Sequence, residues 1–361
     1  MIGKEFVYDS TLWNSQRTEL NCNYVIKTDQ EDFELSESIT FADEIPDTYE
    51  ATQLERALHL ALGMSYYKAF IPPILTHPYE MSDVEASFWN SVFKNGYGEF
   101  LFKNQLSYDQ LAKFSKQDGE VSSKSNTKQK LEKQALLGIG GGKDSIVAGE
   151  LLKQLNIPIK GFVLATGEVL GQTQQVADVM EIPLLAIKRR LDKQIMAINK
   201  LDGAYNGHIP ISLIFGLIGA ISALSNNSAY VIVANEASSS IPQVHYEDSD
   251  VNHQWSKSLE FERLFQDYIH SYVSKDLHYF SAIRPMPSLA VAHTFVKYPK
   301  YFEVFTSDNS LFRINQSERT HPRWSRDSSK SLSSFILLSA LLSEKELMKI
   351  FGHNFLNDPS L

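Results

Sequence analysis

The stretch Ala135-Leu-Leu-Gly-Ile-Gly-Gly-Gly-Lys-Asp-Ser145 decides the fold of this 361-residue chain. Its first five residues predict a short apolar strand, and residues 146–155 predict a helix. Glycines between a strand and a helix allow unusual backbone dihedrals and bring backbone N–H groups close to an anionic oxygen. The free N–H groups of the helix start add positive potential, and Lys143 adds a point charge. The stretch therefore predicts a phosphate-binding loop.

Spacing excludes two well-known phosphate loops. A Walker A loop requires glycine and Ser or Thr at the positions that Leu137 and Asp144 occupy. A Rossmann fingerprint that begins with Gly138 and Gly140 requires a third glycine where Lys143 stands. A glycine-rich turn that binds nothing is the alternative interpretation.

Strands and helices alternate along the chain after this loop. The sequence predicts strands at 159–165, 182–187 and 229–234 and helices at 172–180 and 210–224. Apolar strands that alternate with helices form a parallel sheet covered by helices on both faces. We therefore predict an α/β fold, in which ligands bind at the carboxyl ends of the strands.

The composition divides the chain into three parts. Residues 116–134 are rich in Lys, Ser, Gln and Asn and predict a polar linker or hairpin. Residues 1–115 form an expected N-terminal α+β region for substrate recognition, with helices at 52–70 and 82–93. Residues 135–361 form the domain that carries the glycine loop, with a helical C-terminal extension.

Charge and cysteine content limit the class of protein. The 34 basic and 43 acidic residues give a net charge of −9, so we expect no nucleic-acid partner. The one cysteine, Cys22, excludes an internal disulfide and a multi-cysteine metal site, and it fits a cytoplasmic location. The first residues lack the apolar run of a signal peptide, and the apolar stretch 209–224 is too short for a bilayer. We expect no membrane partner, and the sequence leaves the oligomeric state open.

The loop resembles the Ser-Gly-Gly-Lys-Asp-Ser signature of the PP-loop ATP pyrophosphatases, with Gly140 in place of the first Ser. Those enzymes cleave ATP between its α and β phosphates and adenylate an oxygen of the substrate. The resemblance implies an adenine nucleotide alpha hydrolase-like fold with ATP and Mg²⁺ as cofactors. It implies that Asp144 holds the metal and that the nucleotide contacts Gly140, Gly141, Gly142, Lys143, Asp144, Ser145 and Asn235.

Other segments resemble one member of this superfamily, the ATP-dependent UDP-N-acetylmuramoyl-L-alanyl-L-glutamate epimerases. The resemblance covers about residues 50–355 and rests on segments 54–56, 65–68, 206–210, 235–238, 251–262, 279–285, 301–307 and 323–324. It implies an isomerase of peptidoglycan precursor synthesis with a small UDP-sugar dipeptide as substrate. The terminal L-glutamate would become D-glutamate through an acyl-adenylate, with release of AMP and pyrophosphate.

Polar residues of these segments are the candidate site residues. Asn235 and Glu236 follow the strand 229–234, so they stand at a strand's carboxyl end. The segment 251–262 predicts the start of a helix, where anions are favoured. The candidate proton carriers are Glu236, His208, His253 and Lys257, and the candidate substrate contacts are Asn252, Ser256 and Arg284. Each has a structural alternative, such as a helix cap or a surface salt bridge, and Trp255 is expected in the core.

One part of the family pattern is missing, because other residues stand where this family carries cysteines: Asp308, Ser325, Ser328 and Ser331. Asp and Ser cannot rebuild a thiolate metal site. We expect hydrogen bonds and a buried helix at 335–342 to replace it, and altered chemistry is the alternative. A racemase with two thiols is excluded within a chain that has one cysteine.

Three other functions stay open. A PP-loop ligase or amide-forming enzyme on another small carboxylate would share the adenylate and end with attack by an amine. A non-catalytic homologue would bind ATP without releasing pyrophosphate. An ATP pyrophosphatase acting on tRNA is disfavoured by the charge of −9 and the single cysteine.

Overall fold

The computed structural model describes residues 1–117, 130–165, 171–307, 323–326 and 328–357. The chain forms two compact units, and both are discontinuous in sequence. The first comprises Met1–Glu132, Arg189–Val231 and Ser239–Phe280, and the second Lys133–Lys188, Ile232–Ser238 and Ser281–Leu361. The predicted domains 1–115 and 135–361 differ from these units in that each is continuous in sequence, and this division stays a prediction.

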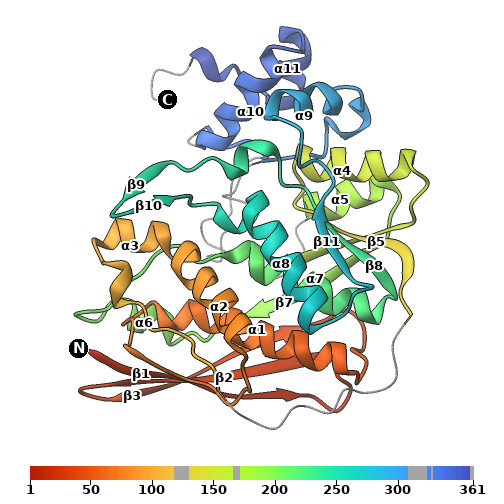
Figure 1. Cartoon of the computed structure of the whole chain (residues 1–361). Helices are drawn as coiled ribbons and strands as arrows, with labels where there is room; N and C mark the ends of the chain where they lie inside the picture. The colour runs from red at the N-terminus through yellow and green to blue at the C-terminus, as the bar shows by residue number, and fades with distance from the viewer. Residues whose placement is uncertain (118–129, 166–170, 308–322, 327, 358–361) are drawn as a thin grey trace. The chain divides into compact units, whose positions relative to one another are not determined.

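The first unit begins with antiparallel strands that the sequence analysis did not locate. β1 (Gly3–Trp13), β2 (Glu19–Thr28) and β3 (Asp32–Thr40) pair in succession, and β4 (Ile74–Thr76) adds parallel to β1. Every second residue of β2 is buried, as expected for a strand with one face on a core. Figure 1 shows β1, β2 and β3 in red at the start of the chain.

Helix α1 (Tyr49–Tyr67) covers this part of the first unit by packing on β1, β2 and α7 (Ile211–Ser225). The Thr48 side chain caps α1 by accepting the N–H of Ala51. The remaining elements of the unit are α2 (Asp83–Gly96), α3 (Gly98–Asn104), η1 (Tyr108–Gln110), α6 (Ile195–Ile198), β9 (Val244–Tyr246), β10 (Ser249–Val251), η3 (Trp255–Lys257) and α8 (Leu259–Tyr272).

The second unit holds the parallel strands that the sequence predicts. β5 (Glu132–Gly138), β6 (Ile159–Ala165) and β7 (Leu184–Arg190) lie side by side and parallel. Helices α4 (Lys143–Gln154) and α5 (Gly171–Met180) follow β5 and β6. Within the described residues the strands form a mixed nine-stranded sheet and a two-stranded hairpin. The predicted α/β class is confirmed.

Two more strands have residues in both units. β8 (Ser228–Val233) and β11 (His278–Ser281) each begin in the first unit and end in the second. Each strand is therefore followed by a segment of the second unit, and these two segments hold Asn235, Glu236 and Arg284.

The C-terminal part of the second unit is helical, as expected, and comprises α9 (Ser288–Phe295), η4 (Pro299–Tyr301), α10 (Ser329–Ser339), α11 (Glu344–Phe351) and η7 (Phe355–Asn357). α10 packs on α9 and α11, with Trp324 and Phe351 in ring contact at 4.5 Å. The predicted helix 335–342 overlaps the second half of α10, which begins earlier because Ser328 caps it and ends at Ser339, so the predicted end is three residues too late.

The apolar stretch 209–224 forms α7, whose residues are almost all buried in the first unit. No helix in the described ranges has both the length and the apolar character needed to cross a bilayer.

Candidate functional site

The glycine loop connects β5 to α4 in the second unit (Figure 1). Gly141 has φ = +80°, a conformation that side chains disfavour, so a glycine is required there. Gly142 precedes α4 as its N-cap and provides no side-chain cap. A Cβ on Gly140 would meet nothing within 4 Å. The loop thus leaves open space beside a helix start without a side-chain cap, the arrangement that phosphate oxygens require.

The first side chains of α4 are close to the loop. Lys143 Nζ donates to Asp144 Oδ1 over 2.6 Å, and the Lys143 side chain is 12% exposed. Ser145 is buried, and its Oγ donates to the Gly142 carbonyl oxygen over 3.0 Å. The lysine is therefore held at the loop by a carboxylate, and the serine fixes the first turn of the helix.

A second segment of this unit fixes the loop from outside. The backbone N–H of Thr306 donates to the Gly141 carbonyl oxygen over 3.0 Å. The Thr306 side chain in turn donates to the carbonyl oxygen of Arg323 over 2.8 Å. Thr306 lies in the segment 301–307 that carries the family resemblance, but the sequence analysis gave it no role. A hydrogen bond of the main chain does not require a particular residue type, so this contact could not be predicted from the sequence.

Asn235 follows β8 and is bound to the end of β11. Its N–H donates to Ser281 Oγ over 2.9 Å, and the same hydroxyl donates to the Asn235 carbonyl oxygen over 2.7 Å. These bonds use the main chain of Asn235 and leave its amide side chain out, so this geometry neither assigns it to a ligand nor excludes one.

Glu236 stands at the start of η2 (Ala237–Ser240), where hydroxyl groups orient its carboxylate. Oε1 accepts bonds from Ser238 Oγ and Ser288 Oγ, both at 2.6 Å. Arg284 Nη1 donates to the Glu236 carbonyl oxygen over 3.3 Å, so it holds the main chain of the candidate base. The second unit therefore brings together Asn235, Glu236 and Arg284.

The other candidates lie in the first unit, where Lys68 holds the segment 206–208. Lys68 Nζ donates to Asn206 Oδ1 over 2.8 Å and to the Gly207 carbonyl oxygen over 2.7 Å. Asn206 Oδ1 also accepts the N–H of Gly207. Lys68 belongs to segment 65–68, which carries the family resemblance, but it is not among the predicted site residues.

His208 is one-third exposed, and its Nδ1 lies 3.8 Å from Glu99 Oε2. Partial burial lowers the pKa of His208 below its usual 6.5, although Glu99 opposes the shift. The charges of His253, Lys257 and Lys68 lower this pKa further. The lowered pKa favours the neutral imidazole, the form that accepts a proton.

His253 has both ring nitrogens engaged by glutamine side chains. Nδ1 lies 2.8 Å from Gln243 Oε1, an acceptor, so Nδ1 carries the proton. Nε2 lies 3.0 Å from Gln254 Nε2, a donor, so it accepts. Both ring nitrogens are thus engaged, so His253 can transfer a proton only if one of these glutamine side chains moves.

The segment around His253 is a turn rather than the start of a helix. The sequence predicts a helix that opens within 251–262, but α8 begins at Leu259, with Ser258 as its cap at 3.1 Å. Asn252 Nδ2 donates to the Ser239 carbonyl oxygen over 2.8 Å. Ser239 Oγ donates to the Lys257 carbonyl oxygen over 2.9 Å.

Through its hydrogen bond to Ser239, the Asn252 side chain stabilises the turn. Ser256 is 3% exposed, which places it inside the unit rather than on its surface. Trp255 is 5% exposed and packs against Phe261, so its expected place in the core is confirmed.

The serines that replace the family's cysteines make hydrogen bonds in the second unit. Ser328 Oγ caps α10 by accepting the N–H of Ser331 over 3.4 Å. The Ser328 N–H donates to the Ser325 carbonyl oxygen over 3.3 Å, and Ser331 is fully buried. Asp308 lies outside the described residues. The Ser328 side chain makes a hydrogen bond of the expected kind, and the replacement of a metal site by such bonds stays a prediction.

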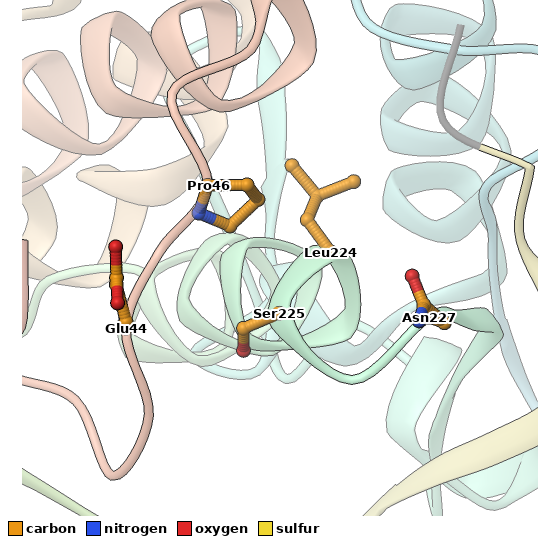
Figure 2. A pocket seen from close by; sticks show the side chains of 5 residues that line it. All are labelled: Glu44, Pro46, Leu224, Ser225 and Asn227. Atoms are coloured by element: carbon orange, nitrogen blue, oxygen red, sulfur yellow. The ribbon is translucent and has the colours of Figure 1, made fainter.

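Within the described ranges, no three His, Cys, Asp or Glu side chains are grouped as a metal site. A pocket of about 240 Å³ in the first unit is lined by Glu44, Pro46, Leu224, Ser225 and Asn227. Figure 2 shows that its lining comes from the end of α7 and the chain before α1. It contains none of the predicted site residues, so it is not the expected nucleotide site.

Comparison with solved structures gives a weak likeness. A predicted subunit of a tRNA methyltransferase from Methanocaldococcus jannaschii matches 45% of this chain and 76% of its own, at 14% identity and a TM-score of 0.30.

Comparison with curated proteins is more informative. UDP-N-acetyl-alpha-D-muramoyl-L-alanyl-L-glutamate epimerase of Xanthomonas oryzae pv. oryzae is 35% identical over 85% of this chain and 68% of its own length. The enzymes of that name from Salinispora tropica and a Micromonospora species are each 30% identical over 84% and 83% of this chain. This chain covers 65% and 66% of those two, so it spans about two thirds of the curated relatives' length.

The MurL N-terminal domain family model matches residues 2–282, which include the glycine loop and the segments around His208 and Glu236. That match and the identities to three epimerases show that this chain belongs to the MurL family of UDP-N-acetyl-alpha-D-muramoyl-L-alanyl-L-glutamate epimerases.

Proposed function

We propose that this chain converts the terminal L-glutamate of UDP-N-acetylmuramoyl-L-alanyl-L-glutamate to D-glutamate, with ATP and Mg²⁺, through an acyl-adenylate. AMP and pyrophosphate are the other products, and the product serves peptidoglycan precursor synthesis. The observation that carries the proposal is the 30–35% identity to three enzymes of that name. The cytoplasmic location expected from the sequence is part of the same proposal.

The glycine loop fits the phosphates of ATP. Its open side at Gly140, the positive φ of Gly141 and the uncapped start of α4 leave backbone N–H groups for anionic oxygens. Lys143 is held beside them and supplies a compact positive charge. We assign the pyrophosphate part of ATP to Gly140–Ser145.

The fit to Mg²⁺ rests on one carboxylate. Magnesium is commonly bound by one or two carboxylates together with substrate phosphates and waters. Asp144 provides one carboxylate at the loop, and its bond to Lys143 sets the direction of that group. Asp144 would thus hold the metal together with phosphate oxygens.

ATP has a chemical reason to take part in this epimerisation. The α-proton of a carboxylate is hard to remove because a second negative charge would develop beside the first. Adenylation of the carboxylate removes the first charge and makes the α-proton more acidic. One protein group then takes the proton, and another returns a proton on the opposite face. Water then hydrolyses the acyl-adenylate, which releases the epimerised substrate and AMP.

The chain offers few groups for these two proton transfers. Cys22 is fully buried, and burial raises the pKa of its thiol well above the usual value, so it is excluded. In the first unit, His208 is one-third exposed and has a lowered pKa, and we favour it over His253, whose ring nitrogens are both engaged. In the second unit, the candidate is Glu236, whose carboxylate is oriented by two hydroxyls.

The test measures AMP, pyrophosphate and the chirality of the released glutamate with wild type and Lys143→Ala. Wild type should form D-glutamate with stoichiometric pyrophosphate, and Lys143→Ala should lose both, by about 10²-fold or more. Lys153→Ala, on the same helix α4, is the matched control and should retain both. Pyrophosphate release without D-glutamate would contradict epimerisation and would favour an amide-forming reaction.

A further inference from the structure

Basic side chains of the first unit lie near His208. His208 lies 3.8 Å from Glu99, and His253, Lys257 and Lys68 are all close enough to lower the pKa of His208 by charge repulsion. Two of these neighbours are lysines, and ammonium groups donate strong hydrogen bonds to oxyanions.

Lys68 carries the least compensated charge of this cluster. Both groups that its Nζ contacts are neutral carbonyl oxygens, at 2.8 Å and 2.7 Å. Among the described residues no carboxylate lies within ion-pair distance of it. An ammonium group has three N–H donors, so one N–H of Lys68 is not used by these contacts.

The charge of Lys68 is also held at a fixed place. Its two bonds join the end of α1 to the segment 206–208, over more than 130 residues of sequence. Burial and Arg189 lower the pKa of Lys68 to about 8, so the ammonium is still the main form at pH 7. Arg189 itself is neutralised by Glu37, with which it forms a buried ion pair.

We propose that Lys68, His208 and Lys257 form a binding site for an oxyanion of the acidic substrate, with Lys68 as its principal charge. The inference rests on the proposed function, because it assigns the cluster to the UDP-sugar dipeptide rather than to ATP. The oxyanion is a phosphate of the UDP group or a carboxylate of the peptide, and both present oxygen acceptors to an ammonium group.

Calorimetric titration tests this with the full chain, α,β-methylene-ATP and UDP-N-acetylmuramoyl-L-alanyl-L-glutamate. Lys68→Gln keeps an N–H donor for Asn206 and Gly207 and removes the charge. It should raise the Kd for the substrate by about ten-fold or more, leave the Kd for the ATP analogue unchanged and reduce the salt dependence of substrate binding. Lys68→Arg should restore most of the affinity.

Lys200→Gln is the control, since Lys200 is an exposed lysine of the same unit. It should bind both ligands as wild type does. Competition by UDP and by L-alanyl-L-glutamate then identifies the oxyanion, because the inhibition constant of only one should depend on Lys68.

The outcomes separate the two proposals. If wild type fails to bind the substrate, the proposed function is overturned and this inference falls with it. If wild type binds but Lys68→Gln has the same Kd, or loses affinity for the ATP analogue instead, only the oxyanion site is overturned.

Discussion

The backbone N–H of Thr306 donates a hydrogen bond to the carbonyl oxygen of Gly141 over 3.0 Å. The two residues are far apart in sequence but belong to the same unit. On the next residue of the loop, a Cβ at Gly142 would stand 3.3 Å from the Thr306 carbonyl oxygen. Thr306, in the chain before α10, therefore fixes the shape of the proposed phosphate loop. Adding a side chain at a glycine of the loop tests this contact.

Gly142→Ala should reduce ATP-dependent pyrophosphate release by about ten-fold or more. The new Cβ requires the loop or Thr306 to move by a few tenths of an ångström, and small misplacements at a reacting centre are costly. Gly171→Ala is the matched control, because open space surrounds that position and it lies outside the proposed phosphate loop. Steady-state pyrophosphate assays on both variants give the comparison, and equal loss in the two would refute the steric account.

The pKa of His208 should fall below 6.5 in an NMR titration of the imidazole signals. Lys68→Gln should raise that pKa, because a nearby cation disfavours the protonated ring. Glu99→Gln should lower it further, because Glu99 is the group that favours protonation. A pKa that responds to neither substitution would mean that the cluster does not exist in solution.

His59 should make the first unit less stable in acid. It is fully buried, with Nδ1 2.6 Å from the Tyr79 hydroxyl, and burial lowers its pKa to about 4. Between about pH 6.5 and 4 the unfolded chain therefore binds a proton that the folded chain excludes, so stability falls as the pH is lowered through this window. The loss should reach at most about 3 kcal/mol.

Urea unfolding of wild type and His59→Gln between pH 4 and 7 measures this effect. The variant should be less stable at pH 7, because its buried contacts change, but its stability should depend less on pH. Parallel pH profiles for the two proteins would show that His59 is not the titrating group.

The ion pair between Arg189 and Glu37 should affect the free energy of unfolding mainly through the desolvation of its two charges. Both side chains are almost completely buried, and Arg189 Nη2 also donates to Ser65 Oγ over 2.7 Å. Arg189→Met alone leaves a buried carboxylate and should cost about 3–5 kcal/mol. The double variant Arg189→Met, Glu37→Leu should recover much of this in chemical unfolding, and a double variant no better than the single one would contradict the argument.

The glycine loop and the parallel strands could be predicted from sequence because both depend on local residue types. The apolar runs 135–139 and 159–165 have no polar interruption, and the glycines between strand and helix are a short-range signal. The N-terminal strands could not be predicted in the same way, because β1–β3 carry many polar residues on their outer face and no glycine-rich hairpin turn joins β1 to β2. Their pairing is a property of the folded unit.

The candidate site was predictable only in part, because several of its contacts join distant segments. Lys68 is brought to Asn206 by the packing of α1, and Thr306 acts on Gly141 through its main chain. The turn at 252–258 was interpreted as a helix start because Leu259, Leu264 and Phe265 give the helical spacing, while the cap Ser258 sets the true beginning. The roles of the predicted site residues stay predictions.

The most direct test of the central claim is a reaction in D₂O with ATP, Mg²⁺ and UDP-N-acetylmuramoyl-L-alanyl-L-glutamate. Pyrophosphate, deuterium at the α-carbon of glutamate and the glutamate's chirality after hydrolysis are followed together. The account predicts D-glutamate that carries one solvent deuterium at the α-carbon for each epimerisation, with pyrophosphate released. Pyrophosphate release with unlabelled L-glutamate would contradict it, because the adenylate would then form without proton exchange.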